Sequence, residues 1–337
     1  MRWILILIVA ILALLGVGAY LLSAPDIPRA VLEAKYATPP SQFVELSYAS
    51  TLPPASGVSD TRATDPNVTA RAHYRVRGPV DAPVLLLLHG SNASLFTWEP
   101  WSKTLSDHFR VVSVDLPGHG LTGATANHDY TAAGMVNFVA AFADKLGLKS
   151  FALAGNSMGG GVAARFAETY PARVSALILV DAGGMPTKMG DHVPIAFKLL
   201  RQSWAQSLLA HLNPRPLVRE GLNDAIVHKA VLTEKMIDLY TDMALLEGSR
   251  QATFERFNQF GGGDANYVKD HVGALKMPVL ILWGEEDHLI PVAAAHLWNK
   301  ALPGSKLIVY PATGHIPMEE VADRSATDVR AFLAGRP

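Results

Sequence analysis

The 337-residue chain contains no cysteine, which excludes disulfide bonds, thiol catalysis and thiolate-bound metal sites. The chain has no large excess of either charge, since 29 basic and 30 acidic residues give a formal net charge of -1. That balance offers no attraction to nucleic acid, so we expect no nucleic-acid partner. No internal repeat or low-complexity tract interrupts the sequence, of which 49% is hydrophobic. A chain of this size and composition can bury a substantial core.

Charged residues are missing altogether from residues 3–22, a run built mainly of Ile, Leu, Val and Ala. A helix needs about 20 apolar residues to cross the hydrocarbon core of a bilayer. We therefore expect a single-pass anchor at residues 1–22 that makes the lipid membrane a partner through residues 3–22. A cleaved signal peptide is the alternative, although its apolar region usually has about 7–15 residues. Arg2 slightly favours a cytoplasmic N-terminus and an extracytoplasmic catalytic domain, a bias that Arg29 and Lys35 nearly cancel.

A proline-bearing tether is expected at residues 23–40, with a short helix around residues 29–36. After it, apolar strands alternate with amphipathic helices, a pattern typical of an α/β fold with a mostly parallel sheet covered on both faces. The expected strands are residues 43–48, 70–76, 84–88, 110–114, 151–154, 176–180, 279–283 and 307–310. The expected helices are residues 98–105, 131–146, 158–170, 293–302 and 325–333. Residues 51–66 form an expected surface loop, rich in Pro, Ser, Thr, Asp and Gly.

The alternation stops between residues 183 and 272, where amphipathic helix patterns occur without a clear strand. We interpret residues 183–272 as a helical cap, inserted into a core made of residues 41–182 and 273–337. Four apolar side chains of this segment are candidates for a substrate pocket, namely Met185, Phe197, Leu200 and Trp204. Ordinary packing of the cap on the core is the more common explanation for any single one of them.

The pentapeptide Gly155-Asn156-Ser157-Met158-Gly159 directly follows an apolar strand and opens a helix. A serine on so tight a strand-to-helix turn is held in a strained conformation that exposes its hydroxyl group at the edge of the sheet. The flanking glycines let neighbouring backbone pass close by. The sequence therefore predicts Ser157 as a nucleophile; a glycine-rich turn needed only for packing is the alternative.

A serine hydroxyl is a weak nucleophile and needs a neighbouring base, for which His315 is the best candidate. It lies in a loop immediately after the last apolar strand. His288 is the main competitor, but it adjoins the expected acid. That acid is Asp287, which also follows a strand and precedes His315 in the chain. Asp181 is the alternative acid.

A pocket for the oxyanion is expected at the turn after residues 84–88. The backbone N–H of Ser91 can lie there beside that of Met158, the residue after the nucleophile. Asn92 is the second choice for the donor. A tight connection without any role in charge stabilisation is the alternative.

Together these segments resemble the successive landmarks of the α/β-hydrolase superfamily, from about residue 43 to the C-terminus. The resemblance is to the branch that contains epoxide hydrolases, haloalkane dehalogenases, carbon–carbon bond hydrolases and small esterases. It implies an eight-stranded sheet with a helical cap after the sixth strand. Because Ser157 stands where the first two of these enzymes have aspartate, their chemistries are not expected. The matching segments are Leu88-His89-Gly90, residues 115–120 (DLPGHG), residues 155–159 (GNSMG), residues 283–287 (WGEED) and Gly314-His315.

The expected function is hydrolysis of a small-molecule carboxylic ester or lactone with a hydrophobic group, through a Ser–His–Asp triad and an acyl-enzyme. Such chemistry requires no metal and no organic cofactor. A carbon–carbon bond hydrolase, a serine-type haloperoxidase or an acyltransferase would share the same residues. A non-enzymatic protein whose cap holds a ligand is the alternative from a different class. The sequence leaves the oligomeric state open.

Overall fold

The structure is a computed structural model that describes residues 22–52, 67–186, 209–259 and 271–335, and singly residues 3, 6, 18, 202, 204 and 206. Within this described part, no helix combines the length and apolar character needed to cross a membrane. The anchor expected at residues 3–22 falls almost entirely outside the described residues.

Eight strands form one sheet in the order β1-β2-β4-β3-β5-β6-β7-β8. β2 pairs in antiparallel fashion with both β1 and β4, whereas every other pair of neighbours is parallel. This confirms the predicted eight-stranded, mostly parallel sheet. The strands are β1 (Ser41–Ala49), β2 (Asn67–Arg77), β3 (Val84–Leu88), β4 (Arg110–Val114), β5 (Phe151–Asn156), β6 (Val174–Val180), β7 (Val279–Gly284) and β8 (Lys306–Tyr310).

Helices cover both faces of the sheet, which explains why the central strands are apolar throughout. Along β3, Leu86 and Leu88 pack into the core on the side of α4, α5 and α12. Leu85 and Leu87 point to the opposite face and pack with α3 and α14. The flanking helices are α3 (Glu99–Leu105), α4 (Ala132–Lys145), α5 (Met158–Thr169), α12 (Ala293–Ala301), α13 (Pro317–Glu320) and α14 (Ala322–Leu333).

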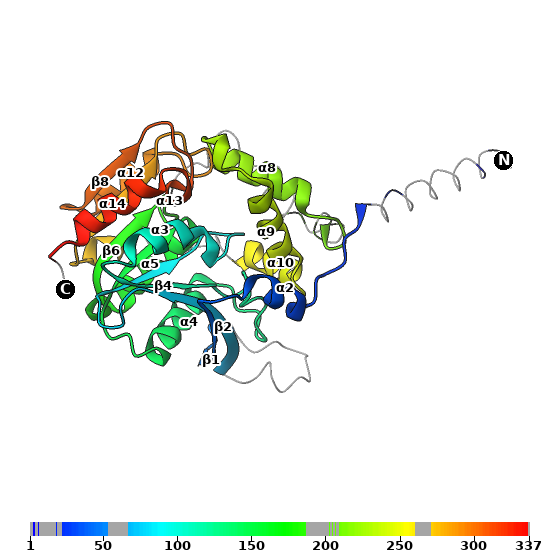
Figure 1. Ribbon diagram of the computed structural model, residues 1–337, viewed down its shortest axis with the longest axis horizontal. Coiled ribbons are helices and arrows are strands. Elements are labelled where there is room, and N and C mark those ends of the chain that lie inside the picture. Colours follow the sequence, from blue (N-terminus) through cyan, green and yellow to red (C-terminus); the bar gives the residue numbers. More distant parts are fainter. Residues whose placement is uncertain are drawn as a thin grey trace.

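Between β6 and β7 the described residues form helices and no strand, here called the inserted segment. Its helices are α8 (Arg215–Ala225), α9 (Glu234–Leu245) and α10 (Ser249–Gln259). In Figure 1 they lie with α2 beside the layers that the sheet and its flanking helices make. The helix expected at residues 195–212 lies largely outside the described residues, and the boundaries of a cap domain stay a prediction.

The segment expected to be a tether is docked onto the inserted segment. Ile27 donates its N–H to Leu245 O at 2.7 Å and accepts one from Glu247 N–H at 3.0 Å. The helix α2 (Arg29–Tyr36) follows, and its Leu32 is buried against α9 and the loop after β4. Described residues of this segment thus contact both the core and the inserted helices, which proline content alone did not indicate.

Candidate active site

Ser157 occupies the turn between β5 and α5 with φ 53° and ψ -119°. Non-glycine residues rarely adopt a positive φ, and such strain marks functional turns. Backbone hydrogen bonds tie the turn to its neighbours: Ser157 N–H donates to Val180 O at 3.0 Å, and Gly183 N–H donates to Ser157 O at 2.8 Å. This is the geometry expected of a nucleophile at a strand-to-helix turn.

The glycines of the turn are required by close backbone contacts. A Cβ at Gly159 would lie 2.4 Å from the carbonyl oxygens of both Leu88 and His89. A Cβ at Gly155 would lie 2.2 Å from the carbonyl oxygen of Gly159. The end of β3 therefore passes directly over the start of α5, which brings the loop after β3 next to Ser157.

His315 and Asp287 are joined by a hydrogen bond of 2.7 Å between Nδ1 and Oδ2. Both side chains are buried, on loops that follow β8 and β7. The other oxygen of Asp287 accepts the N–H groups of Leu289 at 2.8 Å and Ile290 at 2.9 Å. Both oxygens of Asp287 are therefore hydrogen-bonded. Because Asp287 binds Nδ1 of His315, Nε2 is the ring nitrogen that can act as a base.

Asp181 is the alternative acid, and one of its carboxyl oxygens lies within 4.8 Å of atoms of both Asp287 and His315. Burial, and next the charge of Asp287, raise its pKa well above the ordinary value. One of its oxygens accepts the N–H of Gly284 at 2.8 Å. A raised pKa favours the neutral form of Asp181, which stabilises an imidazolium ion less than a carboxylate does.

Asp181, Asp287 and His315 are also the one set of described residues with spacing suited to a metal ion. Two ligands of a tetrahedral ion bound at about 2.0–2.2 Å lie roughly 3.3 Å apart. The 2.7 Å separation of His315 Nδ1 and Asp287 Oδ2 is that of a hydrogen bond. The spacing of these two atoms therefore fits a hydrogen bond and not two ligands of one metal ion.

Asn156 connects the nucleophile turn to the base loop, a role its place in the pentapeptide did not reveal. Its buried Nδ2 donates to His315 O at 3.0 Å and to Val180 O at 3.2 Å. The amide therefore fixes the backbone that carries His315 relative to the strand that carries Ser157.

The loop after β3 is oriented by His89, which is fully buried. Its Nε2 accepts the N–H of Leu116 at 3.0 Å, so its Nδ1 donates to Gly90 O at 2.8 Å. Burial lowers its pKa and keeps the ring neutral. Beyond it, Ser91 and Met158 border the same cavity as Ser157. The assignment of their N–H groups to an oxyanion pocket stays a prediction.

A cavity of about 480 Å³ opens over these residues and is walled mainly by apolar side chains of the inserted segment. Ser157, His315 and Met185 all border it. Phe197 and Leu200 lie outside the described residues. The prediction that Trp204 lines the pocket is wrong, because its side chain is 67% exposed and is absent from the cavity wall. An aromatic residue in a helical pattern indicates an apolar environment, but the pattern alone does not tell which surface that is.

Glu320 is a site residue that sequence reasoning missed. Its carboxylate accepts three backbone N–H groups, from Gly314 and Val227 at 2.8 Å and from His228 at 2.9 Å. It therefore ties the loop that carries His315 to the inserted segment. A glutamate in a short helix after the base loop gives no local signal of that role.

Replacing Glu320 by glutamine should destabilise the protein by about 2–3 kcal/mol, because hydrogen bonds to a charged acceptor are lost and an NH₂ group meets N–H donors. The base loop should also loosen, and we expect kcat on a soluble ester to fall roughly tenfold. Urea unfolding and steady-state kinetics measure both effects, with the exposed Glu285→Gln as control. Unchanged stability and kcat would contradict this role.

The adjacent Glu319 has a raised pKa. Burial raises its pKa to about 7, and the charge of Glu320 adds to the shift. Thr97 and Tyr240 donate hydrogen bonds to its carboxyl group. Between about pH 4.5 and 7 the native protein keeps a proton that the unfolded chain has lost, so this group's contribution to stability falls as pH rises.

Glu319→Gln should therefore be more stable than the wild type at pH 8, by at most about 3 kcal/mol. At pH 4, below both pKa values, the two proteins should unfold alike apart from the effect of the substitution itself. Thermal unfolding at both pH values tests this. An equal difference in Tm at pH 4 and pH 8 would show that folding does not raise the pKa of Glu319.

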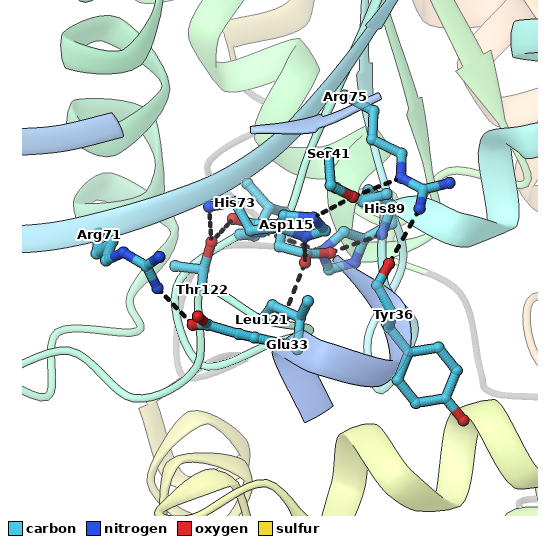
Figure 2. A network of polar contacts seen from close by, with 12 residues as sticks. Glu33, Tyr36, Ser41, Arg71, His73, Arg75, His89, Asp115, Leu121 and Thr122 are labelled. Carbon is cyan, nitrogen blue, oxygen red and sulfur yellow. Dashed lines mark hydrogen bonds and ion pairs between the residues drawn. The ribbon is translucent and has the colours of Figure 1, made fainter. Parts of the chain in front are cut away.

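A second Ser–His–Asp arrangement lies away from the cavity, in the network of Figure 2. Ser41 Oγ is 2.9 Å from His73 Nε2, and His73 Nδ1 is 2.7 Å from Asp115 Oδ2. His73 and Asp115 are fully buried, and none of the three borders the cavity. Arg75 Nε also donates to Ser41 Oγ, at 2.9 Å. This network joins β1, β2 and the loop after β4, and we assign it to structure alone.

The chain belongs to the family described as alpha/beta hydrolase fold, whose model matches residues 83–321. An uncharacterized protein of Mycobacterium tuberculosis is 31% identical over 277 residues, covering 78% of each chain. The monoacylglycerol lipase of Rattus norvegicus is 28% identical over 266 residues, covering 77% of this chain and 78% of the lipase.

Among solved structures, a bacterial membrane phospholipase A is similar in fold, with a TM-score of 0.66 and 23% identity over 99% of both chains. Family membership and the lipase relative support a hydrolytic enzyme. The superfamily inferred from the sequence motifs is thereby confirmed.

Proposed function

We propose that the protein is a serine hydrolase that cleaves a carboxylic ester of a hydrophobic acyl chain. The observation that carries this proposal is the common cavity of Ser157 and His315, with His315 bonded to Asp287 behind it. In the described chain Ser157 Oγ makes no hydrogen bond, and such catalytic bonds often form only when substrate is present.

The reaction proceeds in two steps of acyl transfer. His315 Nε2 takes the proton of Ser157 as Oγ attacks the ester carbonyl, and Asp287 stabilises the imidazolium ion. The N–H groups of Ser91 and Met158 stabilise the oxyanion. The proton then passes to the leaving alcohol, and water activated by His315 releases the acid from the acyl-enzyme.

The shape and lining of the cavity favour a lipid-like ester over a small polar one. An apolar space of about 480 Å³ accommodates an acyl chain of medium length. The monoacylglycerol lipase relative points to the same substrate class. A lactone with a hydrophobic group fits the same site.

Hydrolysis of p-nitrophenyl acetate, octanoate and decanoate and of 1-octanoylglycerol tests the proposal. We expect kcat/KM to rise from acetate to octanoate, because each buried methylene adds about 0.8 kcal/mol of binding until the cavity is full. Adding an alcohol acceptor separates hydrolysis from acyl transfer. A folded protein that turns over none of these esters, or only acetate, would contradict the proposal.

We further propose that residues 3–22 anchor the enzyme in a membrane, with the catalytic core on the extracytoplasmic side. The uncharged apolar run supports this. Deleting residues before Ser23 should release the protein from membranes and leave its activity on soluble esters. Deleting residues before Ser41 would also remove α2, so it should reduce stability. If the protein that lacks residues before Ser23 stays in the membrane fraction, the result would contradict the anchor.

A further inference from the structure

Arg256 places a buried guanidinium group on the wall of the candidate active-site cavity. It belongs to α10, is 2% exposed and borders the same cavity as Ser157. Its Nη2 donates to Asn92 Oδ1, and its Nη1 lies 2.5 Å from His119 Nε2. Nδ1 of His119 donates to Pro117 O at 2.9 Å, so Nε2 is the acceptor for Arg256.

Both acceptors of Arg256 are neutral. Within the described residues no carboxylate forms an ion pair with it, whereas the nearby Arg250 is paired with Asp26 and Arg75 with Glu99. Burial lowers the pKa of Arg256 to about 9, which still leaves it positive at neutral pH. Burying an uncompensated charge is strongly unfavourable, so a counter-charge from a ligand would relieve a real cost.

Arg256 contacts the loop after β3, which passes beside Ser157. Asn92 is two residues beyond Gly90, at which a Cβ would lie 3.1 Å from the Cβ of Ser157. A substrate group that meets Arg256 therefore lies in the cavity that Ser157 borders.

We propose that Arg256 binds an anionic oxygen group, a phosphate or a carboxylate, that the substrate carries near its scissile ester. This inference rests on the proposed function, because it defines the substrate class of the same site. The guanidinium matches either anion through two parallel N–H donors. The apolar walls receive the acyl chain, and Arg256 receives the acidic part of the molecule.

A positioning role for Arg256 is the competing explanation, since Asn92 has a φ of 58° and belongs to the oxyanion loop. Asn92→Asp separates the two. It keeps an oxygen acceptor for Arg256 and supplies the missing counter-charge. A positioning contact would survive or strengthen, whereas binding of a substrate anion would be lost.

The test compares the full chain in neutral detergent with Arg256→Gln, Asn92→Asp and Arg173→Gln. Arg173 is paired with Asp144 and borders no part of the cavity, so it is the matched control. The substrates are neutral 1-octanoylglycerol, 1-octanoylglycerol 3-phosphate and mono-octyl succinate. The quantity compared is kcat/KM for each acidic ester divided by kcat/KM for the neutral one.

We expect the wild type to prefer at least one of the two acidic esters over the neutral one. The preferred ester shows whether the site takes phosphate or carboxylate. Arg256→Gln and Asn92→Asp should lower this ratio by roughly tenfold to hundredfold, and Arg173→Gln should preserve it. Equal losses for neutral and acidic esters, or no preference in the wild type, would overturn the proposal.

Binding to the Ser157→Ala protein makes this test independent of turnover. Octyl phosphate should bind at least tenfold more tightly than octanol by calorimetry, and Arg256→Gln in the same background should abolish the difference. No difference would overturn the anion site even where esters are hydrolysed. If the difference in binding is present but the wild type hydrolyses no ester, the anion site would be supported and the proposed function contradicted.

Discussion

Replacing Ser157 by alanine is expected to lower kcat for ester hydrolysis by roughly 10⁵-fold or more, because the reaction loses its nucleophile. The free energy of unfolding should change by less than about 1 kcal/mol, since alanine keeps the same backbone and small side chain at φ 53°. Octanoate ester kinetics and urea unfolding measure the two quantities on the same preparation.

Ser41→Ala is the matched control, because Ser41 belongs to the other Ser–His–Asp arrangement of the chain. It should leave kcat within about threefold of the wild type, since the network of Figure 2 lies away from the cavity. A large loss in Ser41→Ala with near-normal turnover in Ser157→Ala would move the active site to the first strand.

Asp287→Asn should lower kcat by about 10⁴-fold, because an amide beside Nδ1 of His315 favours the wrong tautomer and provides no charge for the imidazolium. Asp181→Asn should lower it by no more than about tenfold. Burial and the charge of Asp287 raise the pKa of Asp181, which favours its neutral form, and a neutral amide is close to that form in charge and shape.

The pair of variants decides between the two acids that chain order alone left open. Both proteins should fold, which near-ultraviolet circular dichroism would verify before the kinetics. If Asp181→Asn were the more damaging substitution, the charged partner of His315 would be Asp181 and the hydrogen bond to Asp287 would be secondary.

Local patterns sufficed to predict the core. The apolar run of β3 reflects burial on both faces, and the turn around Ser157 combines a strand end, small residues and a helix start. Parallel strands place the loops that follow them at one edge of the sheet, so the strand pattern and the chain order together group Ser157, Asp287 and His315. Each of these signals is contained in a few consecutive residues.

Contacts between distant segments could not be predicted in this way. The docking of Ile27 onto Leu245 and Glu247 is made by backbone groups, which leave no trace in side-chain patterns. The three N–H groups bound by Glu320 come from two loops far apart in the chain. Arg256 looked like any charged residue of a helix, and only its burial beside Asn92 and His119 sets it apart.

The most direct test of the account is to label the full chain in neutral detergent with a fluorophosphonate and to locate the adduct by peptide mass spectrometry. The account predicts one adduct on the peptide that contains Ser157, absent in Ser157→Ala, slow in Asp287→Asn and unchanged in Ser41→Ala. A folded wild-type protein that remains unlabelled, or that carries the adduct on another serine, would contradict it.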